Sequence, residues 1–165
     1  DHREGDGAAL LAEACAHGWE GLIAKRPGSP YAGARSRDWR KLKCEHGQEL
    51  VIGGYTAPRG SREHLGALLV GHYDGDRLRY AGKVGTGFDR ATLADLADRL
   101  ERLRVGRPPF ADRERLPSNP DITWVRPELV AQVGFAEWTG DGLLRHPRFL
   151  GLREDKAAAE VVRER

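Results

Sequence analysis

The sequence lacks the features that define several broad classes of protein. None of its 165 residues falls in an apolar stretch of about 18 residues, so no membrane-spanning helix is expected. The N-terminus shows no basic segment followed by an apolar one, which argues against a secretory signal peptide. We therefore expect a cytoplasmic protein with no membrane partner.

Cysteine and metal-ligand patterns are also scarce. The two cysteines, Cys15 and Cys44, lie 29 positions apart and form no CxxC pair. This spacing indicates neither a disulfide framework nor a zinc site, so both are expected to be reduced thiols. The six histidines show no ligand spacing either and are expected to be surface or structural residues.

Charge is unevenly distributed along a chain whose total formal charge is only +2. Residues 21–44 contain seven lysines or arginines against one acid, a net charge of +6, which leaves −4 for the remainder. A basic block beside an acidic remainder favours a local site for anions such as nucleotide or nucleic-acid phosphate. A solvated charged loop would give the same count, and composition leaves that alternative open.

The first part of the chain predicts one helix and two short strands. Residues 8–17 have helix-forming composition, with Asp6 as the expected N-cap and Gly18 as the expected stop. Residues 19–25 form a short apolar run that ends at a Pro-Gly-Ser-Pro turn, which is typical of a buried strand. Residues 39–44 alternate, which places Trp39, Lys41 and Lys43 on one face of a second strand.

The second part predicts a small barrel that begins after a boundary at residues 45–48. Strand patterns occupy residues 49–55, 65–73, 77–84, 123–126 and 129–138, and a tail segment covers 143–156. A helix capped by Asp89 and running to residue 104 interrupts them, with leucines at three- and four-residue spacing. Three strands, a helix and two strands is the order of the OB fold, a barrel that commonly binds oligonucleotides. Other small barrels with one inserted helix fit the same pattern.

Three groups of residues carry chemical information, and their order matters. The first group is EGLIAK (20–25). The second is WRKLK (39–43), which is preceded by SPY (29–31) and RS (35–36). The third is RHPRFLGLREDK (145–156). One carboxylate with several cations within about 25 residues is what binding a metal-complexed phosphate requires. Taken singly, a glutamate at a strand start or a KxK pair is more often surface charge.

In this order, the groups resemble motifs IV, V and VI of the covalent nucleotidyltransferases, the superfamily of DNA ligases, RNA ligases and capping enzymes. WVRPELV (124–130) and GKVGTGF (82–88) are similar to the barrel domain of ATP-dependent DNA ligases of bacterial non-homologous end joining, the LigD family. The resemblance implies a mostly β chain with some α. Residues 1–46 would be the C-terminal fragment of an α+β nucleotidyltransferase domain, and 47–165 an OB-fold domain.

The resemblance also implies roles for individual residues. Glu20 would help to bind a catalytic Mg²⁺ or Mn²⁺, and Lys41 and Lys43 would contact the α-phosphate of ATP. The remaining residues expected at the nucleotide are Lys25, Arg35 and Trp39. In motif VI, Arg153 and Lys156 would orient the departing pyrophosphate, and Asp155 would position them. The barrel residues expected at the DNA backbone are Lys83 and Thr86.

The reaction implied by the family has three steps. A lysine attacks ATP to form a lysyl-adenylate, AMP passes to a 5′-phosphate, and a 3′-hydroxyl displaces the AMP. The nucleophile belongs to a KxDG motif, which this sequence does not contain. The chain is therefore expected to be a fragment that cannot adenylate itself and that needs an upstream segment with the KxDG lysine.

The partners that the resemblance implies are nicked or broken double-stranded DNA in the bacterial nucleoid, and polymerase and nuclease modules with a DNA-end-binding protein. Two other functions stay open at this point. One is a non-catalytic OB-fold module that binds DNA. The other is an RNA-directed nucleotidyltransferase such as a capping enzyme, against which the ligase-like barrel segments argue.

Overall fold

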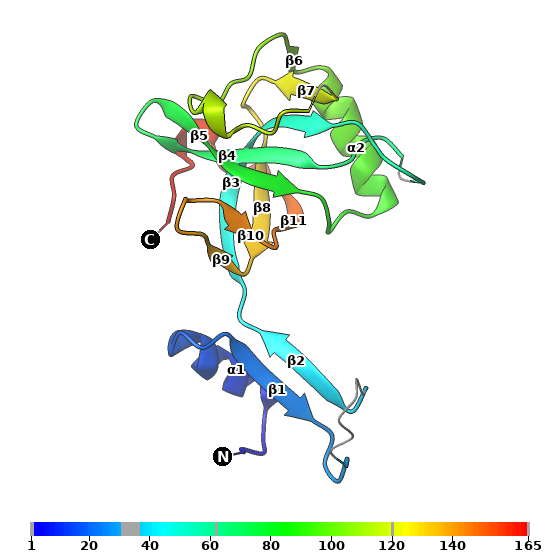
Figure 1. Cartoon of the computed structure of the whole chain (residues 1–165), viewed down its shortest axis with the longest axis vertical. Helices are drawn as coiled ribbons and strands as arrows, with labels where there is room; N and C mark the ends of the chain where they lie inside the picture. The colour runs from blue at the N-terminus through cyan, green and yellow to red at the C-terminus, as the bar shows by residue number, and fades with distance from the viewer. Residues whose placement is uncertain (1, 31–36, 62, 120, 165) are drawn as a thin grey trace. The chain divides into compact units, whose positions relative to one another are not determined.

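The computed structural model describes residues 2–30, 37–61, 63–119 and 121–164. The chain divides into two compact units, Asp1–Glu45 and His46–Arg165, which we call the hairpin unit and the barrel unit. Figure 1 shows the elements of each. Among the described residues, no helix is long and apolar enough to cross a membrane.

The hairpin unit contains the predicted helix and the two predicted strands. Helix α1 (Gly7–Ala16) begins at Asp6, whose side chain accepts a hydrogen bond from the Ala8 amide at 2.9 Å. Strands β1 (Gly21–Lys25) and β2 (Trp39–Lys43) pair antiparallel along their whole length. The sequence therefore located these elements to within one or two residues. The expectation that the first strand is buried was wrong, because Ile23 is 59% exposed and no residue of β1 is fully buried.

The expectation of two reduced cysteines was wrong. Cys15 in α1 and Cys44, just after β2, form a disulfide, with Cα atoms 5.4 Å apart. The cause is tertiary: α1 packs against β1, and the Cys44 amide donates to the Glu20 carbonyl at 2.9 Å. Spacing along the chain contains no information about this approach, because the separation of 29 positions includes a whole hairpin.

The barrel unit is built on a seven-stranded antiparallel sheet. Its main strands are β3 (His46–Thr56), β4 (Leu68–Asp74), β5 (Arg77–Val84), β8 (Val130–Phe135) and β11 (Arg148–Arg153). They lie in the order β11-β8-β3-β4-β5, and the Phe149 amide of β11 donates to the Thr86 carbonyl beyond β5 at 2.8 Å. With helix α2 (Arg90–Glu101) between β5 and β8, this is the predicted OB barrel.

Several elements differ from the prediction. The expected strand 129–138 is interrupted at Ala136, and β11 lies in a segment that was expected only as a tail. Helix α2 ends at Glu101 because the chain turns into β6 (Arg104–Val105), which pairs with β7 (Ile122–Val125). Strands β9 (Glu137–Trp138) and β10 (Leu144–Arg145) form a small hairpin. Two-residue strands are too short for an alternating pattern to reveal them. The remaining elements are single 3-10 turns at Arg113–Arg115 and Ala158–Glu160.

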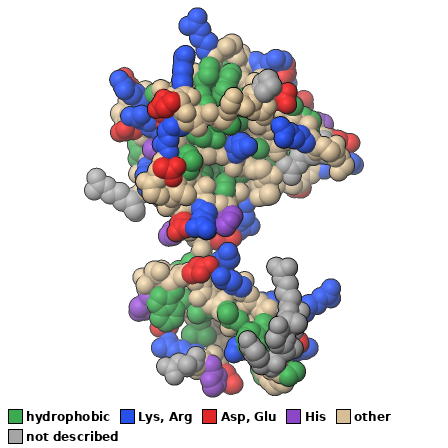
Figure 2. All heavy atoms as spheres, viewed as in Figure 1, with side chains coloured by type: hydrophobic (Ala, Val, Ile, Leu, Met, Phe, Trp, Pro, Cys, Tyr) green, Lys and Arg blue, Asp and Glu red, His purple; other side chains and the backbone are tan. Residues whose placement is uncertain are grey.

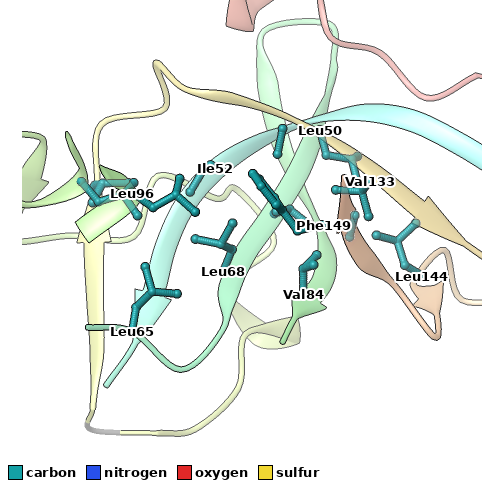
Figure 3. Close-up of a cluster of buried hydrophobic side chains, with 14 of the residues drawn as sticks. Leu50, Ile52, Leu65, Leu68, Val84, Leu96, Val133, Leu144 and Phe149 are labelled. Carbon is teal, nitrogen blue, oxygen red and sulfur yellow. The ribbon is translucent and has the colours of Figure 1, made fainter. Parts of the chain in front are cut away.

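The main core of the barrel lies between the sheet and α2, and Figure 3 shows its side chains converging. It includes Leu50, Ile52, Leu68, Val84, Leu96, Val133 and Phe149. Burying each such side chain contributes about 1.5–3 kcal/mol. The leucines predicted to line one stripe of α2 are buried, so the helical period correctly identified the face of α2 that packs inward.

A second apolar cluster covers the opposite face of β3 and holds the end of the described chain. Val161 packs there with Phe110 and Tyr80, and its carbonyl accepts a hydrogen bond from the Tyr73 amide at 2.7 Å. The buried Gln48 amide donates to the Val162 carbonyl at 3.0 Å. The segment after motif VI is thus anchored to the barrel.

Candidate functional site

The first group of site residues lies on the β1–β2 hairpin. Glu20 immediately precedes β1, and Lys41 lies at the centre of β2, opposite Ile23. Lys41 Nζ donates to Glu20 Oε1 at 2.8 Å. The side chains are 51% and 74% exposed, so the pair contributes at most about 1 kcal/mol to stability. Either group can exchange its partner for a metal ion or a phosphate at little cost.

The other predicted nucleotide contacts of β2 lie on the same face as Lys41. Alternation along the strand places Trp39 and Lys43 beside it, as predicted. Lys25, opposite Trp39 in β1, lies with Nζ 4.0 Å from the centre of the indole ring. This cation–π contact holds the lysine stem over an aromatic surface. Arg35, the remaining residue predicted here, lies outside the described residues.

The hairpin also has a basic hollow that sequence reasoning did not identify. Its volume is ≈ 400 Å³, and its lining consists of Ala24, Lys25, Arg26, Arg37, Asp38 and Arg40. Arg26 and Asp38 form an ion pair at 3.3 Å. The +6 net charge of residues 21–44 was a signal for a basic region, but not for a concave one.

The second group lies at the end of β11 in the barrel unit. Arg153 binds Asp155 through two hydrogen bonds, from Nε to Oδ1 at 2.8 Å and from Nη2 to Oδ2 at 2.7 Å. The hydrogen bond from Arg153 lowers the pKa of Asp155 to about 2. Asp155 therefore stays ionised at neutral pH and fixes the plane of the guanidinium group.

Glu49 of β3 joins both cations of motif VI, and sequence reasoning missed it. Arg153 Nη1 donates to its Oε1 at 2.9 Å, and Lys156 Nζ donates to its Oε2 at 3.1 Å. The side chain is only 14% exposed. The hydrogen bond from Lys156 lowers the pKa of Glu49, against the opposing effect of burial. A glutamate in an otherwise apolar strand was the available signal, because buried carboxylates need partners.

The two barrel residues predicted at DNA lie around the closure of the barrel. Lys83 is exposed on β5, opposite Leu69. Thr86 is also exposed, and its hydroxyl donates to the Pro147 carbonyl at 3.5 Å. Figure 2 shows basic and acidic side chains interspersed on the visible face of the barrel unit. The described residues contain no cluster of three or more acidic, histidine or cysteine side chains that could hold a metal ion.

Comparison with known proteins decides the family. Residues 61–156, more than half of the chain, match the family described as ATP dependent DNA ligase C terminal region. The chain belongs to the ATP-dependent DNA ligases. The resemblance and the mostly β, OB-fold architecture inferred from the sequence are thereby confirmed.

Among individual ligases, the chain is 52% identical to the multifunctional non-homologous end joining protein LigD of Pseudomonas aeruginosa. This match covers 94% of the chain and 19% of that protein. The LigD protein of Mycobacterium tuberculosis H37Rv is 44% identical over 97% of the chain and 21% of its own length. The chain therefore spans about a fifth of these curated relatives.

Solved ligase structures extend the likeness to three dimensions. The ligase domain of M. tuberculosis LigD matches with a TM-score of 0.69 and 45% identity, covering 98% of this chain and 53% of that one. A mycobacterial DNA ligase D complexed with ATP and MES matches with a TM-score of 0.67 and 44% identity, covering 98% and 52%. Both units of the chain thus have counterparts within a ligase domain.

Proposed function

We propose that the chain is the C-terminal part of the ligase module of an ATP-dependent, LigD-type ligase that seals breaks in double-stranded DNA. The observation that carries this proposal is the match to the LigD ligase domain over 98% of the chain at 45% identity. The exposed Glu20–Lys41 pair, poised to exchange partners, supports it. The reaction would pass through lysyl-adenylate and DNA-adenylate intermediates.

The two units take different parts in this proposal. The hairpin unit would be the C-terminal fragment of the nucleotidyltransferase domain, with motifs IV and V. The barrel unit would be the OB domain, with motif VI at the end of β11. The KxDG lysine would come from an upstream nucleotidyltransferase segment, so the chain alone would not form an adenylate.

In the hairpin unit, Glu20 would be one ligand of Mg²⁺ or Mn²⁺. Its carboxylate fits a hard cation and is exposed, but a complete coordination shell needs further oxygens from nucleotide, water or the upstream segment. When bound, the metal would neutralise phosphate charge. Lys41 and Lys43 would contact the α-phosphate of ATP, because fixed cations stabilise charge that develops there. Lys25, Arg35 and Trp39 would complete the nucleotide contacts.

In the barrel unit, Arg153 and Lys156 would orient pyrophosphate as it leaves, and Asp155 would hold the guanidinium group. Lys83 and Thr86 would contact the DNA backbone. Polymerase and nuclease modules and a DNA-end-binding protein are the proposed partners in end joining at the bacterial nucleoid.

Complementation tests the proposal. The chain is mixed with a separate polypeptide that carries the KxDG segment, and sealing of nicked DNA is measured with ATP and Mg²⁺. We expect sealing from the mixture and none from the chain alone. Glu20→Ala and Lys43→Ala should each reduce sealing by about 10²-fold or more, the usual effect of removing one charge-stabilising group.

Matched controls come from the same unit. Glu13→Ala and Arg3→Ala break an exposed ion pair of 2.9 Å between α1 and the segment before it, and should leave sealing unchanged. Normal sealing by both Glu20→Ala and Lys43→Ala would refute the active-site assignment. DNA binding without any sealing would instead favour the non-catalytic OB module.

A further inference from the structure

Glu49 connects motif VI, at the end of β11, with strand β3 across strand β8. It lies on β3 directly opposite Gln132 of β8, and Gln132 lies opposite Gly151 of β11. Gln132 Oε1 also accepts a hydrogen bond from Arg153 Nη1 at 3.1 Å. The Arg153 side chain thus reaches back across β8 to β3, and its position depends on strands that are far apart in sequence.

The two oxygens of Glu49 bind different cations. Arg153 approaches Oε1 and Lys156 approaches Oε2, at 2.9 and 3.1 Å. The two positive groups therefore converge on a single small anion. Two cations that converge on the oxygens of a carboxylate are also spaced to converge on the oxygens of a phosphate. Without Glu49, their mutual repulsion would separate them.

Both cations keep the capacity to bind a further anion, although Arg153 already binds Asp155 as well as Glu49. An ammonium group has three N–H donors and a guanidinium group has five. Lys156 is 30% exposed and Arg153 is 36% exposed, whereas Glu49 between them is 14% exposed. The Glu49 carboxylate is therefore more buried than the two cations, which remain accessible to an anion from solvent.

Glu49 also differs from the residues that build the barrel. Its neighbours Leu50 and Val51 are fully buried members of the two apolar clusters, but Glu49 belongs to neither cluster. Its contacts with Arg153 and Lys156 account for its lowered pKa. The energetic reason for a charge at this position is therefore the pair of cations and not the core.

We propose that Glu49 is a positioning residue for the adenylation step. Glu49 holds the Arg153 and Lys156 side chains close together, so that both contact the pyrophosphate group of ATP. This proposal rests on the proposed function, because it assumes that motif VI acts in that step. Glu49 itself need not touch the nucleotide. Its loss should slow adenylation and spare a reaction that starts from DNA that is already adenylated.

The test uses the full-length ligase and two assays. The first measures transfer of labelled AMP from ATP to the enzyme, at saturating and at varied ATP. The second measures sealing of a nick that already carries AMP. For Glu49→Ala we expect adenylation about tenfold to a hundredfold slower at saturating ATP, the range produced by misplacing groups by about an ångström. Sealing of the adenylated nick should change less than twofold.

Two further variants separate positioning from simple loss of structure. Glu49→Gln keeps the size of the side chain but removes its charge and replaces one oxygen with an NH2 donor, which cannot accept a hydrogen bond from a cation. Adenylation should therefore still fall several-fold. Glu63→Ala breaks an exposed ion pair with Arg90 in the same unit and should leave both assays unchanged. Normal adenylation by Glu49→Gln would overturn the proposal, as would equal losses in the two assays.

Arg153→Ala makes the two possible failures distinguishable. If adenylation falls with Arg153→Ala but not with Glu49→Ala or Glu49→Gln, the positioning role is wrong and the role of motif VI stands. If Arg153→Ala also adenylates normally, the proposed role of motif VI in that step fails, and the role of Glu49 fails with it.

Discussion

Glu20 and Lys41, 21 positions apart in sequence, are joined by a 2.8 Å ion pair that is open to solvent on both sides. An exposed pair of this kind contributes at most about 1 kcal/mol to folding. A carboxylate and a lysine that contribute so little to stability are available for catalysis. Substitutions of Glu20 or Lys41 should therefore affect activity much more than stability.

The first prediction concerns this separation. Glu20→Gln should lower the free energy of unfolding by less than about 1 kcal/mol, because the pair is exposed. The same change should reduce nick sealing by about 10²-fold if Glu20 binds metal. Urea denaturation and a sealing assay in the complemented enzyme measure the two effects. A large loss of stability with unchanged specific activity would show that Glu20 is structural.

The second prediction concerns the disulfide between Cys15 and Cys44. A disulfide that joins positions 29 apart should stabilise the hairpin unit by about 3.5 kcal/mol. Reduction should therefore speed hydrogen exchange of the α1 amides. Alkylation of the unreduced, denatured protein should modify neither cysteine, and alkylation after reduction should modify both.

The Cys15→Ser and Cys44→Ser double variant is the control, since its α1 amides should exchange at one rate with and without reductant. Alkylation of both thiols before reduction would contradict the disulfide and restore the expectation from sequence.

Local patterns predicted three features correctly. The Asp6 cap, the leucine stripe of α2 and the shared face of Lys41 and Lys43 all follow from backbone periodicity. The cysteine pair could not be read in this way, because its formation depends on α1 packing against the hairpin. Periodicity describes which face a residue occupies but not what packs against that face.

The third prediction concerns Gly87, in the turn that leads out of β5. Its φ is +93°, and a Cβ there would lie 2.2 Å from the Phe149 carbonyl oxygen. Gly87→Ala should therefore separate Thr86 from Phe149 and destabilise the barrel by more than 1 kcal/mol, since both strain and collision oppose the side chain. Thermal unfolding of the chain measures this loss.

Gly85 provides the matched control two residues earlier. A Cβ there would meet Ala67 Cβ at 3.7 Å, an ordinary contact. Gly85→Ala should change the free energy of unfolding by about 0.5 kcal/mol or less. The unfolding temperature should therefore stay within about a degree or two of wild type. Equal effects of the two changes would mean that the turn does not constrain the barrel.

Motif VI, like the cysteine pair, has a contact that could not be predicted from the sequence. The sequence REDK led to the prediction of Arg153, Asp155 and Lys156 as site residues, but Glu49 is 104 positions from Arg153. The pairing of β3 with β8 and of β8 with β11 brings these residues together. A contact made through two strand pairings cannot be inferred from any short window. A charged residue in an apolar strand indicated only that some partner was needed.

The last prediction follows from the pKa of Glu49, which lies below its ordinary value of 4.5 because Lys156 donates a hydrogen bond to the carboxylate. A carboxyl group whose pKa is lower in the folded state stabilises the fold above its unfolded pKa, and this contribution is lost as pH falls through the folded pKa. Wild type should therefore exceed Glu49→Gln in stability above about pH 4.5, and the difference should shrink as the solution becomes more acidic. Carbon-detected NMR titration of Glu49 gives the folded pKa directly, and Lys156→Met should raise it. A pKa of 4.5 or higher in the wild type, or no change with Lys156→Met, would show that the ammonium group does not hold this carboxylate.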